Sequence, residues 1–131
     1  MNYFTTYIAE ILILIFILIT FLQSGIDKAM DWKGNTGWLK EHFANTFLAN
    51  QVPLMVGILM IIEVITGILA ILGIIWFIAY GESSFGLYAC VLAAITLLML
   101  LFGQRVAKDY AGAFTITGYF VVVIFGVYIM S

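Results

Sequence analysis

Two glutamates lie inside long apolar stretches of this sequence, and their position alone suggests chemistry. Glu63 is near the middle of the apolar run 54–77, and Glu10 is the only charged residue in the run 3–23. A carboxyl group in hydrocarbon is costly, so its presence points to a proton pathway, a ligand site or a bond between helices. We interpret both glutamates as candidate functional residues.

Composition places these carboxyl groups in a membrane protein. Of the 131 residues, 65% are apolar and 9% are charged, which is far from the balance of a soluble domain. Four apolar stretches are long enough to cross a bilayer as helices, near residues 3–23, 53–80, 85–102 and 112–130. We therefore predict an all-α, polytopic membrane protein, in which a single domain, residues 1–131, forms a bundle of four transmembrane helices. The sequence has no basic patch for nucleic acid, so the lipid bilayer and other membrane subunits are the expected partners.

The connection between the first two spans has an amphipathic pattern. Within residues 37–48, Leu39, Phe43 and Phe47 recur every four residues, and polar side chains fall between them. This pattern predicts a short interfacial helix along the membrane surface. His42 lies in this stretch, and we interpret it as an interfacial polar residue because no second metal ligand stands beside it.

The basic residues set the expected orientation. All five lie in the first and third connections, at Lys28, Lys33, Lys40, Arg105 and Lys108. Cytoplasmic loops are rich in lysine and arginine, so both connections are expected in the cytoplasm and both termini outside.

A charge cluster is expected at the same end of the bundle, formed by Asp27, Asp31, Arg105, Lys108 and Asp109. Its members would pair and tie the two helical hairpins together. The alternative is a solvated loop with weak surface pairs.

Depth along the helices suggests that the two glutamates meet. Counted from the cytoplasmic ends of their spans, Glu63 lies about 15 Å deep and Glu10 about 20 Å deep. If the two carboxyl groups meet, at least one is expected to be protonated near neutral pH, because desolvation and repulsion disfavour two charges. Such a pair would transfer protons or hold a quinone carbonyl, whereas the competing interpretation makes Glu63 only a hydrogen-bonded link between helices.

The surroundings of Glu63 indicate a helix interface. Gly67, Ala70 and Gly73 lie close to its face of the helix, where small residues let a neighbouring helix approach. Glu63 is therefore expected to be buried against span one or four, with these candidate partners: Glu10, Ser24, Thr115, Thr117 and Tyr119.

No catalytic residue set can be recognised in the sequence. It has no nucleophile–base pair, no phosphate-binding glycine loop and no cluster of metal ligands. We expect no metal site, no intrinsic cofactor and no catalysis by this chain on its own.

Short motifs in the first half of the chain resemble the DoxX family of small four-helix bacterial membrane proteins. They are Ser24-Gly25 with Lys28, a proline that opens the second span, and Glu63 followed by Gly67. The residues that match the family pattern are Ser24, Gly25, Lys28, Glu63 and Gly67, and the resemblance transfers no catalytic residue set. It implies a multi-pass protein of the bacterial cytoplasmic (inner) membrane.

The resemblance also implies a function. The family takes its name from a small subunit of a thiosulfate- or quinol-linked redox complex. We therefore expect an accessory or anchor subunit of a membrane redox complex, with quinone as a possible ligand near Glu63. Two alternatives stay open: a non-enzymatic interaction or assembly protein that binds another membrane protein, and a homo-oligomeric, proton-coupled carrier that uses Glu10 and Glu63.

Overall fold

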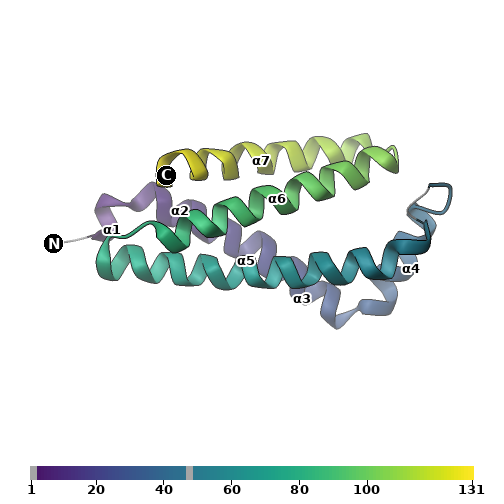
Figure 1. Ribbon diagram of the computed structural model, residues 1–131, viewed down its shortest axis with the longest axis horizontal. Coiled ribbons are helices and arrows are strands. Elements are labelled where there is room, and N and C mark those ends of the chain that lie inside the picture. Colours follow the sequence, from purple (N-terminus) through teal and green to yellow (C-terminus); the bar gives the residue numbers. More distant parts are fainter. Residues whose placement is uncertain (1–2, 47–48) are drawn as a thin grey trace.

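The computed structural model describes residues 3–46 and 49–131, and the regular structure in these ranges is helical (Figure 1). The first span is composite, with α1 (Tyr3–Thr6), α2 (Ile8–Ile17), a π-helical segment η1 (Leu18–Leu22) and α3 (Gln23–Met30). It is followed by α4 (Trp32–His42) and a short 3₁₀ turn, η2 (Ala49–Gln51). The three remaining helices are α5 (Val52–Tyr80), α6 (Ser84–Val106) and α7 (Tyr110–Met130).

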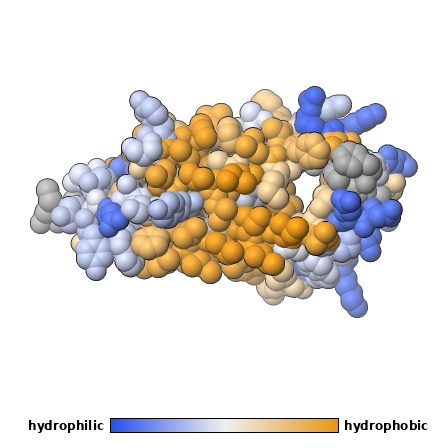
Figure 2. Space-filling model, viewed as in Figure 1, coloured by the Kyte–Doolittle hydropathy of each residue, from blue (hydrophilic) through white to orange (hydrophobic). Residues whose placement is uncertain are grey.

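Four helical stretches of the described residues are long and apolar enough to cross a membrane: Ile8–Met30, Val52–Tyr80, Ser84–Val106 and Tyr110–Met130. They confirm the predicted all-α architecture and the four helices long enough to span a membrane. On the face seen in Figure 2, apolar residues cover the middle of the molecule and hydrophilic residues gather at its ends. Large apolar side chains such as Leu12, Ile61 and Phe125 are more than half exposed along these helices, as is expected of side chains that face lipid.

Three predicted helix boundaries differ from the structure. The third long helix ends at Val106 instead of residue 102. The first helix continues past residue 23 to Met30, although its last eight residues are only weakly apolar, because Lys28 finds an acceptor inside the bundle. The next helix spans Trp32–His42 instead of 37–48. Thr36 lies inside that helix, where its hydroxyl donates to the carbonyl of Trp32 at 2.8 Å. Residues 47–48 of the predicted interfacial helix lie outside the described residues.

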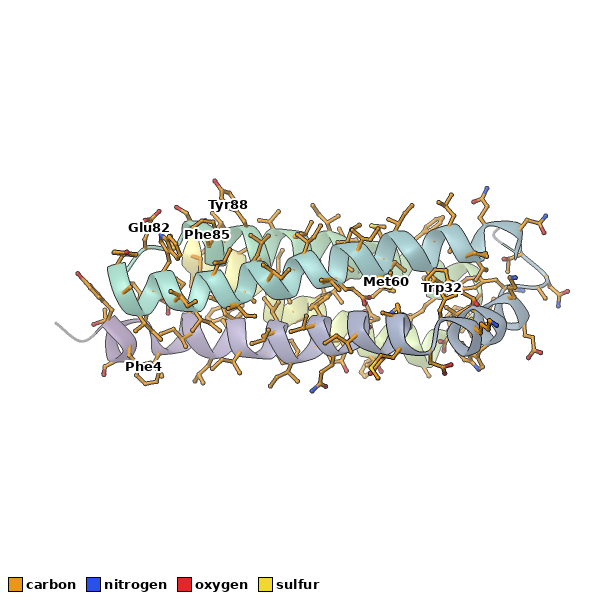
Figure 3. All side chains as sticks on the ribbon, turned by 90° about the horizontal axis from the view of Figure 1, so that it is seen from below. Phe4, Trp32, Met60, Glu82, Phe85 and Tyr88 are labelled. Carbon is orange, nitrogen blue, oxygen red and sulfur yellow. The ribbon has the colours of Figure 1, made fainter. Side chains whose placement is uncertain are left out.

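Neighbouring spans pack as antiparallel partners, and α5 is the central one. It contacts the first span along one side and α6 along another, while α7 packs mainly on α6. Figure 3 shows the first span and α5 side by side. The main core is formed by buried apolar residues from all four spans, among them Ile11, Leu14, Phe21, Ala70, Phe77, Cys90, Leu97 and Val123.

Two glycines allow a close contact between α5 and α6. A Cβ atom at Gly73 would lie 2.8 Å from both the Cα and the N of Gly86, so the two backbones touch at this point. The turn that follows is also tight, because Gly81 ends α5 with a φ of 64°, in the left-handed region that suits glycine. The helices are therefore held together at the end where α5 leads into α6.

The first and third connections lie at the opposite end of the bundle, as expected from their charges (Figure 1). There, Phe43 packs with Val52 and Val56 of α5, and Val106 at the end of α6 packs against the same cluster. The start of α1 and the end of α7 share the other end of the molecule. The polar end therefore combines α4 with the turn between α6 and α7.

A substitution that adds one methyl group at Gly73 tests its contact with Gly86. Gly73→Ala should lower the free energy of unfolding by about 1–3 kcal/mol, because the new Cβ meets backbone atoms that cannot move aside. Gly118→Ala is the matched control, since no atom lies within 4 Å of its added Cβ. That control should be neutral or stabilise by up to about 1 kcal/mol. Thermal unfolding in mild detergent measures both, and equal midpoints would contradict the packing described.

Candidate functional site

A buried ion pair joins the first span to α5. The carboxylate of Glu63, only 1% exposed, accepts from the Lys28 ammonium, whose Nζ lies 3.1 Å from Oε2 and 3.2 Å from Oε1. The same ammonium donates to the Oγ of Ser24 at 2.6 Å. A lysine ammonium has three hydrogens, so these three acceptors satisfy it in a part of the molecule where an unpaired charge would be costly.

Helix geometry explains how the three side chains meet. Ser24 and Lys28 are four residues apart in α3, so they lie on the same face one turn apart. Gly25 brings this face close to α5, because a Cβ there would lie 2.8 Å from the Cγ2 of Val64. Gly67 makes a similar contact with Leu22, whose Cβ would lie 2.8 Å from an added methyl group. These two close contacts at glycine place Lys28 within reach of Glu63.

The predicted meeting of Glu10 with Glu63 is wrong. Gly25 lies beside Val64, next to Glu63, whereas Leu14 lies beside Gly73. Glu10 precedes Gly25 by roughly 22 Å of helix and lies, only partly exposed, in the first turn of α2. The predicted first span ends at residue 23, whereas the helix continues to Met30. Glu10 therefore lies farther from the polar end of the bundle than Glu63 does.

The other expected partners of Glu63 have mixed outcomes. Ser24 belongs to the network through Lys28. Thr115 and Thr117 are exposed and instead donate to carbonyl groups of their own helix, at 3.3 Å and 2.9 Å. Tyr119 packs edge-on against Phe16, with ring centroids 5.8 Å apart, and lines a groove next to Lys28.

That groove lies between the first span and α7. Its volume is about 370 Å³, and most of its lining is polar: Thr20, Gln23, Ser24, Asp27, Lys28 and Tyr119, with Ile19. The π-helical segment Leu18–Leu22 contributes to its wall. Single π-helical turns inside α-helices are frequent at functional sites, and this one ends two residues before Ser24.

A cavity lies on the other side of Lys28, beneath α4. Its volume is about 260 Å³, and its walls come from α4, α5 and α6. A second hollow of about 490 Å³ shares Met55, Leu59, Met99 and Gly103 with it and continues between α5 and α6. Figure 2 shows the surface hollowed near the polar end of the molecule. Lys28 therefore stands between a polar groove and a mainly apolar cavity.

The expected charge cluster is organised by Asp109. Its carboxylate caps α7 by accepting from the backbone N–H of Gly112 at 3.0 Å, and its Oδ2 lies 3.9 Å from the Nε2 of His42. This contact links the first and third connections. Arg105 lies over the ring of Tyr110 at 5.2 Å, within its own connection. The remaining members, Asp27, Asp31 and Lys108, are exposed.

Sequence reasoning missed three features of the site. It did not identify Lys28 as the partner of Glu63, although Lys28 and Ser24 have the spacing of one helical turn. It did not single out Gln104, whose side-chain Oε1 is buried and has no hydrogen-bond partner among the described residues. It also gave no sign of the π-helical segment, because residues 18–22 are an ordinary apolar run.

The Lys28–Glu63 pair predicts a non-additive mutant series. Lys28→Met should lower the free energy of unfolding by about 3–5 kcal/mol, because Glu63 would keep its burial and lose its charged partner. The double variant Lys28→Met/Glu63→Leu should regain most of that loss, since it removes both charges together. Unfolding in detergent by denaturant measures the cycle. Additive losses in the double variant would show that the two side chains do not interact.

Comparison with protein-family models, with curated proteins and with solved structures finds no match to this chain. The chemistry of the site must therefore be inferred from its own contacts. These contacts define a charge-neutral ionic centre, a groove with several hydroxyl and amide groups on one side, and an apolar cavity with a polar end on the other.

Proposed function

We propose that this chain is an integral membrane accessory subunit that binds the head of a quinone in the groove beside Lys28, as part of a redox complex. The observation that carries the proposal is the buried network of Ser24, Lys28 and Glu63 at the wall of that groove. A quinone head offers two carbonyl oxygens and therefore needs hydrogen-bond donors from the protein.

The groove offers such donors. Ser24 accepts from Lys28 through its oxygen, so its own hydroxyl hydrogen remains to be donated. Tyr119 and Gln23 add a phenol and an amide to the same lining. Ile19, 53% exposed to the lipid side, gives an apolar edge along which the tail of the molecule would leave. In this proposal the ion pair is a positioning element, because it fixes Ser24 through Lys28.

The family resemblance supports the same proposal. Ser24, Gly25, Lys28, Glu63 and Gly67 carry the DoxX-like pattern, and they lie together where α3 packs on α5. A pattern whose members converge in space is better support for a shared role than the same residues scattered over the fold. We therefore propose a DoxX-like protein of the bacterial cytoplasmic membrane.

The alternatives differ in what they require of the site. A proton-coupled carrier was expected to use Glu10 together with Glu63, and the two lie far apart along the bundle. An assembly protein would need only a surface for another membrane protein, for which α4 at the polar end is the natural candidate. Co-purified chains distinguish these possibilities: a redox enzyme supports the proposal, an unrelated client supports the assembly role, and a pure homo-oligomer favours the carrier.

Quinone binding should depend on the donors of the groove. Ser24→Ala and Tyr119→Phe should each weaken binding of a short-chain benzoquinone about three- to tenfold, the scale of one hydrogen bond. Titration of the purified protein, followed by tryptophan fluorescence or calorimetry, gives the dissociation constants. Thr115→Val is the control on the same helix as Tyr119, because its hydroxyl is exposed and bonded to its own backbone. Unchanged binding in both groove variants would overturn the proposal.

The proposed orientation has both termini outside the cell. In a Cys90→Ala background, Ser131→Cys should react with a membrane-impermeant thiol reagent in intact cells, and Lys33→Cys should be protected. The expectation follows from the five basic residues at the other end of the bundle. Labelling of position 33 together with protection of position 131 would reverse the orientation.

A further inference from the structure

The polar end of the cavity beneath α4 has hydrogen-bond acceptors that the protein leaves available. The Oε1 of Gln104 is buried and unpartnered among the described residues, and Gln104 and Asp109 both line the cavity. The Nε2 of Gln104 and the carboxylate of Asp109 converge at Gly112, where each would overlap an added Cβ. The amide nitrogen is thus turned towards Asp109, and the oxygen at its other side is left without a donor.

The second acceptor is the Oδ2 of Asp109. It lies 3.9 Å from the Nε2 of His42, which is too far for a hydrogen bond. Among the described residues, the other ionisable side chains that line the cavity are His42 and Lys28, and the charge of Lys28 is balanced by Glu63. The polar end therefore offers two acceptor oxygens, one of them on a carboxylate, which together favour a cationic group with N–H hydrogens.

The rest of the cavity is suited to hydrocarbon. From Gln104 the hollow follows α6 back to Ile95, roughly 13 Å along the helix. Its sides are formed by apolar residues of α5 and α6, including Met55, Ile58, Leu98 and Phe102. Ile58, Leu98 and Phe102 are 42–58% exposed on the surface that would face lipid. A ligand would therefore enter sideways from the bilayer, with its tail between the two helices.

We propose that this cavity binds a membrane phospholipid with a primary ammonium head, such as phosphatidylethanolamine. The ammonium donates to the Oε1 of Gln104 and the Oδ2 of Asp109 beneath α4, and one acyl chain lies between α5 and α6. This site is on the opposite side of Lys28 from the quinone groove, so it does not depend on the proposed function.

Two lipids that differ only in the head nitrogen test the proposal. Phosphatidylethanolamine carries three N–H hydrogens, whereas phosphatidylcholine with the same acyl chains has a quaternary nitrogen and none. The protein, extracted in mild detergent and mixed with either lipid, is examined by native mass spectrometry for the retained lipid. Retention of phosphatidylethanolamine should exceed that of phosphatidylcholine by about tenfold, because a charge-assisted hydrogen bond is lost. Equal retention, or a preference for the anionic phosphatidylglycerol, would overturn the proposal.

Substitutions in the cavity then test whether the preference for phosphatidylethanolamine arises there. Gln104→Leu and Asp109→Asn should each reduce the ratio between the two lipids to near one, and Asn still serves as the N-cap of α7. Glu82→Gln, the same change of charge at the opposite end of the bundle, should leave the ratio unaltered. If Gln104→Leu does not fold, the ratio of retained phosphatidylethanolamine to phosphatidylcholine in the unaltered protein and in Asp109→Asn still tests the proposal. A ratio that survives both cavity variants would assign the lipid to another surface and overturn the proposal.

Discussion

The ion pair between Lys28 and Glu63 is the constraint on which the polar half of the bundle depends. A carboxylate that is 1% exposed cannot keep its charge in an apolar bundle without a partner. Lys28 supplies that partner only because α3 remains helical after the chain has lost its apolar character, and only because Gly25 lets α3 approach α5. The length of the first helix and its close contact with α5 are therefore both required to satisfy one buried charge.

The sequence predicts the features that depend on local composition. Four spans follow from four apolar runs, since twenty apolar residues in a helix are enough to cross a bilayer. The burial of Glu63 follows from its small neighbours Gly67 and Ala70, which mark the face that meets another helix. The shared end of the first and third connections follows from the alternating direction of successive spans, and the distribution of basic residues agrees with it.

What the sequence does not predict depends on pairs of helices. From the sequence alone, the polar residues Ser24 and Lys28 indicate that the chain leaves the membrane. Their burial depends on Glu63 of α5, which the local sequence does not reveal. The predicted pairing of Glu10 with Glu63 is wrong for the same reason. The depth of Glu10 is counted from a helix end at residue 23, whereas the helix continues to Met30. The cavity beneath α4 lies where α4, α5 and α6 meet, so no property of one helix alone determines it.

The contact between Gly73 and Gly86 has a mechanical consequence. It fixes the separation of α5 and α6 near one end of the bundle, while the same two helices enclose a hollow near the other end. The two helices touch near Gly73 and Gly86 and diverge towards the polar end. A change in the angle between α5 and α6 would therefore alter the width of the hollow at the polar end while the glycine contact stays unchanged.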